Sequence, residues 1–245
     1  MSGRMASLSG KVAVITGGSR GIGLAIAGAL RAHGADVAIT GTSREHLAAA
    51  EATLRSAEGD GRLLALPADV REYTAVESAV AEVVSTCGGL DILVNNAGVG
   101  VFRSVAETTV EDWHRVIDTN LTGVFYGCHA ALPHLRARGG GWIINISSLA
   151  SKNPFVNAAA YCASKAALNA FTEALMQEVR YEGIRVAYVL PGSVNTGFGG
   201  RSKTKASGVL MPEDVAQVVA DLVAHPSRSL PSRVEIRPAQ PPRKA

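Results

Sequence analysis

The residue types with the clearest chemical potential are a phenol and an ammonium, Tyr161 and Lys165, which lie four positions apart in an Ala-rich stretch at residues 157–171. If this stretch is a helix, residues four apart share one face, one turn from each other. One interpretation is a packed tyrosine beside a lysine whose stem reaches to water. The other is a proton-transfer pair, in which the ammonium lowers the pKa of the phenol and the phenol gives up or takes a proton.

A glycine-rich turn, TGGSRGIG at residues 16–23, lies between an apolar run and an amphipathic segment. Gly17, Gly21 and Gly23 have the spacing G-x3-G-x-G. A strand–turn–helix unit with so little side-chain bulk lets the backbone approach a pyrophosphate, which then lies at the positive end of the helix dipole. The alternative is a tight turn that needs glycine only for its dihedral angles.

The elements that must position these residues alternate along the chain, apolar run with helical pattern, which predicts βαβ units around a parallel sheet. Most of the runs are continuously apolar, as is typical of strands covered by helices on both faces. The predicted strands are 11–16, 36–40, 62–67, 91–96, 141–147, 184–190 and 233–237. The predicted helices are 21–33, 44–58, 71–87, 110–138, 158–181 and 212–224. The fourth helix contains Pro133, so we expect it to bend or end nearby.

Two of the helix starts carry their own signals. In TTVEDW, a threonine followed three residues later by an acidic residue resembles a capping box. In LMPEDVA, Pro212 suits the first position of a helix, because its missing N–H has no partner there in any case.

The chain has 245 residues, of which 47% are hydrophobic and 18% charged, and this composition predicts one globular domain over residues 1–245. We expect flexible ends at about 1–7 and 238–245, and a mobile stretch at 197–209. The net charge of +3 is too small and too scattered for a nucleic-acid surface. No apolar run approaches the roughly 18 residues that a membrane span needs.

Three cysteines, Cys87, Cys128 and Cys162, occur in an odd number and without the spacing of a metal site. This pattern favours a reduced compartment, so we expect a cytoplasmic protein. The six histidines form no ligand pattern either, and we expect no metal requirement.

Six motifs occur in one order along the chain: TGGSRGIG, NNAG at 95–98, DTNLTGVFY, INISS, YCASK and PGSVNT. Together they resemble the segments of the classical short-chain dehydrogenases/reductases, and the resemblance covers roughly residues 8 to 225. It implies a Rossmann-like, doubly wound α/β fold with a seven-stranded parallel sheet in the order 3-2-1-4-5-6-7 and helices on both faces. It also implies an oxidoreductase that uses NAD(P).

The resemblance implies four catalytic residues, Asn120, Ser148, Tyr161 and Lys165. Tyr161 is the general acid in reduction and the general base in oxidation, while Lys165 lowers its pKa and binds the nicotinamide ribose. Ser148 precedes Tyr161 by 13 residues and holds the substrate oxygen; Ser147 is the competing candidate. Asn120 is implied to hold a local helix distortion and a water of the proton relay. The alternative is a mid-helix asparagine that bonds only to backbone.

The cofactor is expected to be NADP(H) rather than NAD(H). Gly41 stands where the NAD-type members of the family usually have an aspartate, which would repel a 2′-phosphate. Arg20 and Arg44 bring cations to that phosphate, unless both simply face water. Asp69 resembles the adenine contact of the family, although it could instead cap the following helix. The other implied cofactor contacts are Thr16, Gly17, Ser19, Gly21, Ile22, Gly23, Thr42, Ser43, Val70, Asn96, Ala97, Gly98, Tyr161, Lys165, Pro191, Gly192, Val194 and Thr196.

The substrate is expected to be a small molecule with a carbonyl or alcohol group, hydrophobic or of medium size, because the expected pocket walls are mainly apolar and aromatic. The leading hypothesis is the NADP(H)-dependent reduction of a ketone, an aldehyde or a 3-oxoacyl carbonyl to a secondary alcohol. The expected substrate contacts are Ser148, Asn153, Phe155, Tyr161 and Phe198, with Val101 and Phe102 as further walls.

Two other functions stay open: an alcohol or polyol dehydrogenase that works in oxidation, and a non-catalytic regulator that binds NADP. Basic residues at Arg103, Arg201, Lys203 and Lys205 would suit an anionic acyl carrier. The resemblance also implies a homodimer or homotetramer in which the long helices from Val110 and Ala158 form the contact surface.

Overall fold

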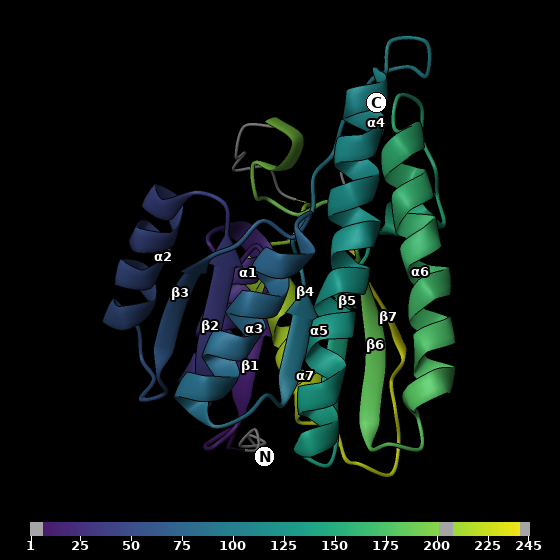
Figure 1. Cartoon of the computed structure of the whole chain (residues 1–245). Coiled ribbons are helices and arrows are strands. Elements are labelled where there is room, and N and C mark those ends of the chain that lie inside the picture. Colours follow the sequence, from purple (N-terminus) through teal and green to yellow (C-terminus); the bar gives the residue numbers. More distant parts are fainter. Residues whose placement is uncertain (1–6, 201–207, 241–245) are drawn as a thin grey trace.

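The computed structural model describes residues 7–200 and 208–240 and shows a seven-stranded parallel sheet (Figure 1). The strand order is β3-β2-β1-β4-β5-β6-β7, so the predicted fold class and topology are confirmed. All seven predicted strands are present, although most are shorter than predicted. They are β1 Val12–Ile15, β2 Asp36–Gly41, β3 Leu63–Pro67, β4 Ile92–Asn95, β5 Gly141–Ile146, β6 Ile184–Pro191 and β7 Arg233–Ile236.

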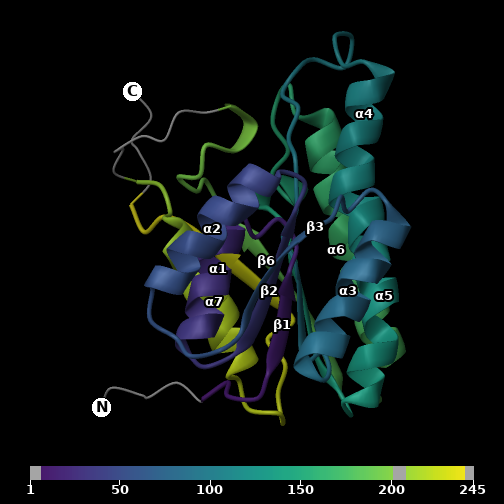
Figure 2. The same ribbon diagram turned by 60° about the vertical axis from the view of Figure 1, so that its left-hand side comes forward.

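Helices cover both faces of the sheet, as Figure 2 shows from the side. On one face lie α1, α2 and α7, and on the other lie α3, α5 and α6, while α4 rises above the sheet at the top of Figure 1. Their bounds are α1 Gly21–Ala32, α2 Arg44–Ser56, α3 Tyr73–Cys87, α4 Val110–Ile117, α5 Gly123–Ala137, α6 Ala159–Val179 and α7 Pro212–Val223. Two short 3-10 turns, Leu149–Ser151 and Phe198–Gly200, follow β5 and β6.

The continuously apolar strands separate two hydrophobic cores. Along β5 the side chains alternate: Ile143 packs in the core under α3, α5 and α6, and Ile144 packs in the core under α1 and α7. Both are fully buried. Burial of one such side chain contributes about 1.5–3 kcal/mol, so a strand buried on both faces is held strongly in register.

The predicted helix 110–138 is present but distorted. It consists of α4, a π-helical turn at Asp118–Thr122 and α5, which continues through Pro133 and ends at Ala137. The distortion therefore lies about Asn120, where the resemblance implies it, and not at Pro133. A proline removes only one helical hydrogen bond, and the neighbours Ala131 and Leu135 are fully buried and hold α5 on the sheet.

The predicted helix starts are also confirmed. Thr109 is the N-cap of α4, and its hydroxyl accepts a hydrogen bond from Asp112 N at 3.1 Å. Pro212 is the first residue of α7. Thr109 gives a partner to one of the backbone N–H groups that a helix start leaves without one, and Pro212 has no backbone N–H that would need a partner.

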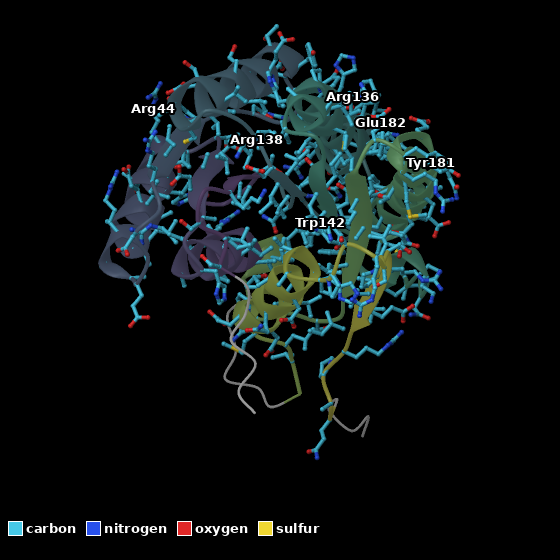
Figure 3. All side chains as sticks on the ribbon, turned by 90° about the horizontal axis from the view of Figure 1, so that it is seen from below. Arg44, Arg136, Arg138, Trp142, Tyr181 and Glu182 are labelled. Atoms are coloured by element: carbon cyan, nitrogen blue, oxygen red, sulfur yellow. The ribbon has the colours of Figure 1, made fainter. Side chains whose placement is uncertain are left out.

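At the amino edge of the sheet, where the strands begin, charged side chains hold the connections together (Figure 3). The buried carboxylate of Asp91 accepts hydrogen bonds from Lys11 Nζ at 3.0 Å, Val12 N at 3.0 Å and Arg138 Nη2 at 2.8 Å. Burial alone would raise the pKa of Asp91, but these three donors outweigh it and lower the pKa.

Further contacts of this kind lie at the same edge. Arg136 and Glu182, labelled in Figure 3, form an ion pair that joins the end of α5 to the turn before β6. The buried guanidinium of Arg31 donates to the carbonyls of Leu54 and Ala57, where α2 ends.

Some expectations lie outside the described residues. These are most of the ends predicted to be flexible, the central part of the stretch 197–209, and Arg201, Lys203 and Lys205. Within the described ranges, no helix is both long enough and apolar enough to cross a membrane.

Candidate active site

The glycine turn after β1 is shaped by backbone conformation and by close contact. Gly17 and Gly21 have φ angles of 64° and 55°, in the left-handed region that glycine adopts readily. At Gly23, a Cβ atom would lie 2.4 Å from Asn96 Nδ2 and 2.5 Å from the carbonyl oxygen of Gly17. The fold of the turn therefore requires these glycines, and at these three positions no side chain covers the backbone.

The NNAG motif at the end of β4 holds this turn from behind. The hydroxyl oxygen of Thr16 accepts hydrogen bonds from the backbone N–H groups of Asn96 and Ala97, at 3.0 and 3.1 Å. In return, Asn96 Nδ2 donates to the carbonyls of Thr16 and Gly17, both at 3.0 Å. Thr16 is buried, so its hydroxyl serves the connection between the two motifs.

The first turn of α1 has the properties of an anion site. Arg20 is the N-cap residue, its side chain makes no capping hydrogen bond, and the first turn holds no acidic residue. Arg20 itself is exposed. The backbone N–H groups at the start of this 12-residue helix, together with the glycine turn, can therefore receive a pyrophosphate.

The segment PGSVNT after β6 reaches the same turn. Gly192 N donates to the carbonyl of Ile236 at 2.9 Å, and Val194 pairs with Leu210. Thr196 then comes close to the glycine turn, because a Cβ on Gly21 would lie 3.3 Å from its side chain. Gly21 and Thr196, two predicted cofactor contacts that lie far apart in the sequence, are thus neighbours in the fold.

At the end of β2, Gly41 lies against Ser19 of the glycine turn, since a Cβ on Gly41 would be 3.3 Å from Ser19 Oγ. Ser43 caps α2 by accepting a hydrogen bond from His46 N at 3.2 Å. The next residue, Arg44, is exposed, as is Thr42. An aspartate at position 41 would crowd Ser19. The nearby cationic side chains in the sequence, Arg20 and Arg44, are exposed to solvent.

Asp69 and Val70 follow β3 and have different surroundings. The carboxylate of Asp69 forms an ion pair with Arg71 at 2.6 Å, and this hydrogen bond holds its pKa below the ordinary value. The N-cap of α3 is Glu72, so the alternative that Asp69 caps this helix is wrong. Val70 is buried against Gly123 at the start of α5.

The two candidate serines after β5 differ in their partners. Ser147 is buried, and its hydroxyl donates to Asn169 Oδ1 of α6 at 2.6 Å. Ser148 accepts a hydrogen bond from Ala150 N at 3.1 Å and also forms a side-chain hydrogen bond with Tyr161. Only Ser148 of these two is thus connected to the phenol.

Tyr161 and Lys165 lie one turn apart on α6, as the sequence predicts. Burial raises the pKa of Tyr161, and the hydrogen bond to Ser148 partly offsets this rise. Lys165 is 5% exposed and donates to the carbonyl of Ile146 at 2.8 Å; burial lowers its pKa to about 8. That Lys165 lowers the pKa of Tyr161 stays a prediction.

Asn120 occupies the π-helical turn and bridges two segments. Its Oδ1 accepts from Val99 N at 2.8 Å, and its Nδ2 donates to Val99 O at 2.9 Å and to Ser164 Oγ at 3.1 Å. Ser164 Oγ in turn donates to the carbonyl of Tyr161 at 2.8 Å. The alternative of an asparagine bonded only to backbone is therefore wrong.

Val99, Ser164 and Ile146 are the residues that sequence reasoning missed. Ser164 is the polar residue directly before Lys165 in YCASK, a position that could have drawn attention to it. Nothing in the sequence marks Val99 and Ile146, because they act through their backbone groups. Gly98 ties these parts together, since a Cβ there would lie 3.4 Å from Asn120 Oδ1 and 3.8 Å from Lys165 Nζ.

A chain of buried polar groups holds α6 against the sheet. Asn95 Nδ2 donates to Asn145 Oδ1 at 2.9 Å and to Cys128 Sγ at 3.4 Å. Asn145 Nδ2 then donates to Thr172 Oγ1 on α6 at 2.8 Å. Burial raises the pKa of the Cys128 thiol to about 12, which excludes it as a nucleophile near neutral pH.

The predicted substrate residues come from three loops. Phe102 and Phe198 lie beside Tyr161, with centroid distances of 5.7 and 5.6 Å to its ring, and Phe155 stacks on Phe102 at 6.1 Å. Asn153 is exposed on the loop that carries Phe155. Val101 is buried in a small cluster with Val116 and Ala160, the residue before Tyr161, so it packs within the protein and is not an open pocket wall.

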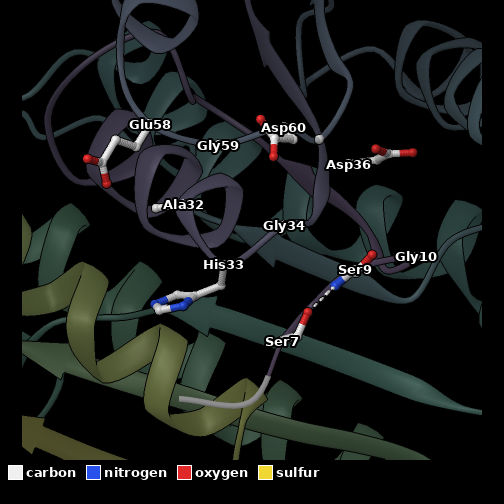
Figure 4. A pocket seen from close by; sticks show the side chains of 11 residues that line it. Ser7, Ser9, Gly10, Ala32, His33, Gly34, Asp36, Glu58, Gly59 and Asp60 are labelled. Carbon is white, nitrogen blue, oxygen red and sulfur yellow. Dashed lines mark hydrogen bonds between the residues drawn. The ribbon is translucent and has the colours of Figure 1, made fainter. Parts of the chain in front are cut away.

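A separate hollow lies at the opposite end of the sheet (Figure 4). Its lining includes His33, Asp36, Glu58 and Asp60, and none of the predicted catalytic or cofactor residues. In the part of the chain that the structure describes, no group of three or more His, Cys, Asp or Glu side chains is arranged to hold a metal ion.

A family model described as short chain dehydrogenase matches residues 11–207 of this sequence. This chain belongs to the short-chain dehydrogenase family. Among the curated relatives of this short-chain dehydrogenase, an uncharacterized oxidoreductase of Staphylococcus haemolyticus is 34% identical, and the match covers 96% of this chain and 100% of that protein. An uncharacterized oxidoreductase of Methylorubrum extorquens is 38% identical, with 91% and 94% covered.

Solved structures agree with this assignment to the short-chain dehydrogenases. An alcohol dehydrogenase from Thermococcus sibiricus, complexed with 5-hydroxy-NADP, has a TM-score of 0.88 and 32% identity, covering 96% of this chain and 99% of that one. A metagenomic short-chain oxidoreductase in complex with NADP has a TM-score of 0.84 and 37% identity, covering 96% and 100%. This short-chain dehydrogenase is therefore an oxidoreductase.

Proposed function

We propose that this oxidoreductase reduces the carbonyl of a ketone, an aldehyde or a 3-oxoacyl compound to a secondary alcohol with NADPH. The observation that carries the proposal is the grouping of three side chains: the Ser148 hydroxyl, which lowers the pKa of Tyr161, the Tyr161 phenol itself, and the buried ammonium of Lys165 one helical turn along α6. A hydroxyl pair of this kind can bind one carbonyl oxygen and deliver a proton to it.

The cofactor is NADP(H). Its pyrophosphate fits the glycine turn and the uncapped start of α1, and its 2′-phosphate fits the edge formed by Gly41, Arg20 and Arg44. Solved relatives with this fold hold NADP or 5-hydroxy-NADP, which supports the same choice. When bound, the reduced nicotinamide supplies the hydride that the substrate carbon accepts.

Tyr161 gives its proton to the substrate oxygen as charge develops there. Burial raises the pKa of Tyr161, so the phenol stays protonated near neutral pH, which suits an acid in reduction. Ser148 orients the oxygen and stabilises its charge. Lys165 binds the ribose and favours the phenolate that remains, and Asn120 keeps the relay in place through Val99 and Ser164.

A cofactor consumption assay tests the direction and the substrate class together. Purified protein is mixed with NADPH and a panel of ketones, aldehydes and 3-oxoacyl thioesters, and in parallel with NADP⁺ and a panel of alcohols and polyols. We expect NADPH oxidation near neutral pH with formation of a secondary alcohol. Turnover with the polyol panel alone would favour a dehydrogenase working in oxidation, and no turnover with either panel would favour a regulator.

The adjacent serines offer a matched pair of variants for the mechanism. Ser148→Ala should lower turnover by about 100-fold, because the substrate oxygen loses a hydrogen-bond donor in the transition state. Ser147→Ala removes the hydroxyl that binds Asn169, and should cost stability while leaving turnover within about threefold. Equal losses of turnover in both variants would contradict the assignment.

As part of the same proposal, the enzyme is a cytoplasmic homodimer or homotetramer. Cys87, Cys128 and Cys162 are all free thiols, which supports a reduced compartment. Exposed Trp113 on α4 and Phe125 on α5 support contact through these helices. Light scattering should give the mass of two or four chains, and Phe125→Asp should lower it; the mass of one chain for the unaltered protein would contradict the proposal.

A further inference from the structure

The aromatic residues of this protein are distributed unevenly. The chain holds five phenylalanines in 245 residues, and three of them form one cluster beside Tyr161: Phe102 and Phe198 contact its ring, and Phe155 stacks on Phe102. Phe102 is the centre of the group: its centroid lies 6.1 Å from that of Phe155 and 6.3 Å from that of Phe198. The two main cores are built largely from aliphatic residues.

The three rings come from segments far apart in the sequence, so this cluster is not a consequence of local order. Phe102 follows β4, Phe155 precedes α6, and Phe198 follows β6. Phe198 N also donates to Thr196 Oγ1 at 3.3 Å, and Thr196 lies against the glycine turn. The aromatic cluster and the expected cofactor site thus share one connecting segment.

Two glycines make room for the central ring. A Cβ on Gly100 would lie 2.8 Å from the Phe102 ring and 2.9 Å from that of Phe198. A Cβ on Gly199, whose φ angle is 67°, would lie 2.4 Å from Phe102. The rings are therefore packed on bare backbone, which fixes their positions beside Tyr161.

These rings are not completely covered. Phe155 is 47% exposed and Phe198 is 36% exposed, while Phe102 is partly buried between them. Large apolar side chains grouped in this way and left open to water mark a surface for an apolar ligand. The planar faces and edges of the rings favour a planar aromatic ligand over a saturated one, with each good ring pair worth about two- to tenfold in binding.

We propose that the substrate is an aryl ketone, a ketone whose carbonyl carbon carries an aromatic ring. The carbonyl oxygen meets Ser148 and Tyr161, and the aryl group lies among Phe102, Phe155 and Phe198. This inference rests on the proposed carbonyl reduction and narrows its substrate class. It disfavours a linear 3-oxoacyl chain, which has no ring to place against the cluster.

The test compares two ketones of nearly equal size, acetophenone and cyclohexyl methyl ketone, which differ in whether the ring is aromatic. With NADPH, kcat/KM for acetophenone should exceed that for cyclohexyl methyl ketone by about tenfold or more. A linear 3-oxo ester is measured beside them. Its reduction at a higher kcat/KM than acetophenone would overturn the inference.

Variants assign the preference to the rings. Phe155→Leu and Phe198→Leu keep an apolar side chain in exposed loop positions, and each should lower the ratio between the two ketones by about three- to tenfold. Tyr181→Leu is the control, because Tyr181 is 91% exposed at the other end of α6 and should leave the ratio unchanged. An unchanged ratio in both phenylalanine variants would also overturn the inference.

The outcomes separate this inference from the function on which it rests. If the enzyme reduces acetophenone and cyclohexyl methyl ketone equally well, carbonyl reduction stands and the aryl preference is wrong. If it oxidises NADPH with none of the three ketones but does so with an aldehyde or a 3-oxoacyl thioester, the aryl preference alone is wrong. If it oxidises NADPH with none of these carbonyl compounds, the proposed carbonyl reduction fails as well.

Discussion

At the amino edge of the sheet, Asp91 is 4% exposed and accepts hydrogen bonds from Lys11, Val12 and Arg138. At the carboxyl edge, Lys165 is 5% exposed, and the partner that the described residues provide is one backbone carbonyl, that of Ile146. The pKa of Asp91 is lowered, so the fold favours its charged form. The pKa of Lys165 is also lowered, to about 8, so there the fold disfavours the charge.

This difference separates the part of the molecule that stabilises the fold from the part that performs chemistry. A buried charge with several good partners supports stability, whereas a buried charge with few partners costs stability and is typical of functional sites. The glycine turn and the half-exposed aromatic rings lie at the same edge as Lys165. Removing the buried charge at the amino edge should therefore lower the free energy of unfolding, whereas removing the buried charge at the carboxyl edge should raise it.

The largest effect on cofactor affinity is expected at the glycine turn. Gly23→Ala places a methyl group 2.4 Å from Asn96 Nδ2, so the turn must open, and the affinity for NADPH should fall by at least about 100-fold, near 3 kcal/mol. Fluorescence titration with NADPH measures this. Gly28→Ala on the same helix meets nothing closer than 3.6 Å and should leave the affinity unchanged. Wild-type affinity in Gly23→Ala would contradict the role of the turn.

At the amino edge, Asp91→Ala should lower the free energy of unfolding by about 2–3 kcal/mol, because it leaves partly buried donors without their acceptor. Urea denaturation measures the loss, and kcat per folded molecule should stay within about twofold. Because the pKa of Asp91 is lowered, its contribution is present above the unfolded pKa and disappears as the pH falls through the folded pKa. A large loss of kcat would place this edge in the chemistry.

At the carboxyl edge, Lys165→Met should raise the free energy of unfolding at pH 7 by on the order of 2 kcal/mol. The folded pKa of about 8 is below the ordinary lysine value of 10.5, so the cost of the buried charge is fully present below pH 8. It decreases as the pH rises toward the unfolded pKa, and the advantage of the variant should decrease with it. Lys11→Met, which removes a partner of Asp91, should destabilise the protein; a loss of stability in Lys165→Met would break the comparison.

The smallest effect concerns the choice of cofactor. Arg44→Ala should weaken NADPH binding by about tenfold, near 1.4 kcal/mol, and NADH binding by less than about twofold, because only NADPH carries the 2′-phosphate. Arg55→Ala on the same helix is the control, since Arg55 pairs with Glu51 near the far end of α2. Equal losses for both cofactors would show that Arg44 does not distinguish them.

Much of the fold could be predicted because it rests on local pattern. The runs that form β1, β4 and β5 are apolar at almost every position, which a strand buried on both faces requires, whereas β7 alternates charged and apolar residues at the edge of the sheet. The distorted turn Asp118–Thr122 contains no proline or glycine that would break a helix. Pro133 is such a residue, but α5 continues through it. Asn120 holds the distortion by contacts that arise only in the folded chain.

The site could be predicted to the level of its residue types and spacing. Spacing predicts Ser148 in place of Ser147, but only packing explains why: the hydroxyl of Ser147 donates its hydrogen bond to Asn169 of α6. The partners of Asn120, Val99 and Ser164, lie 21 and 44 positions away, and backbone groups leave no mark in a sequence. The pKa shifts of Tyr161 and Lys165 depend on burial, which no spacing rule supplies.

Turnover of Tyr161→Phe tests the central claim most directly, because this change removes the hydroxyl that delivers the proton and keeps the ring that packs against Phe102 and Phe198. With NADPH and a ketone that the wild-type enzyme reduces, kcat should fall by about 1,000-fold, while the Kd for NADPH stays within about threefold of the wild type. A variant that keeps more than about a tenth of the wild-type kcat would contradict proton delivery by Tyr161.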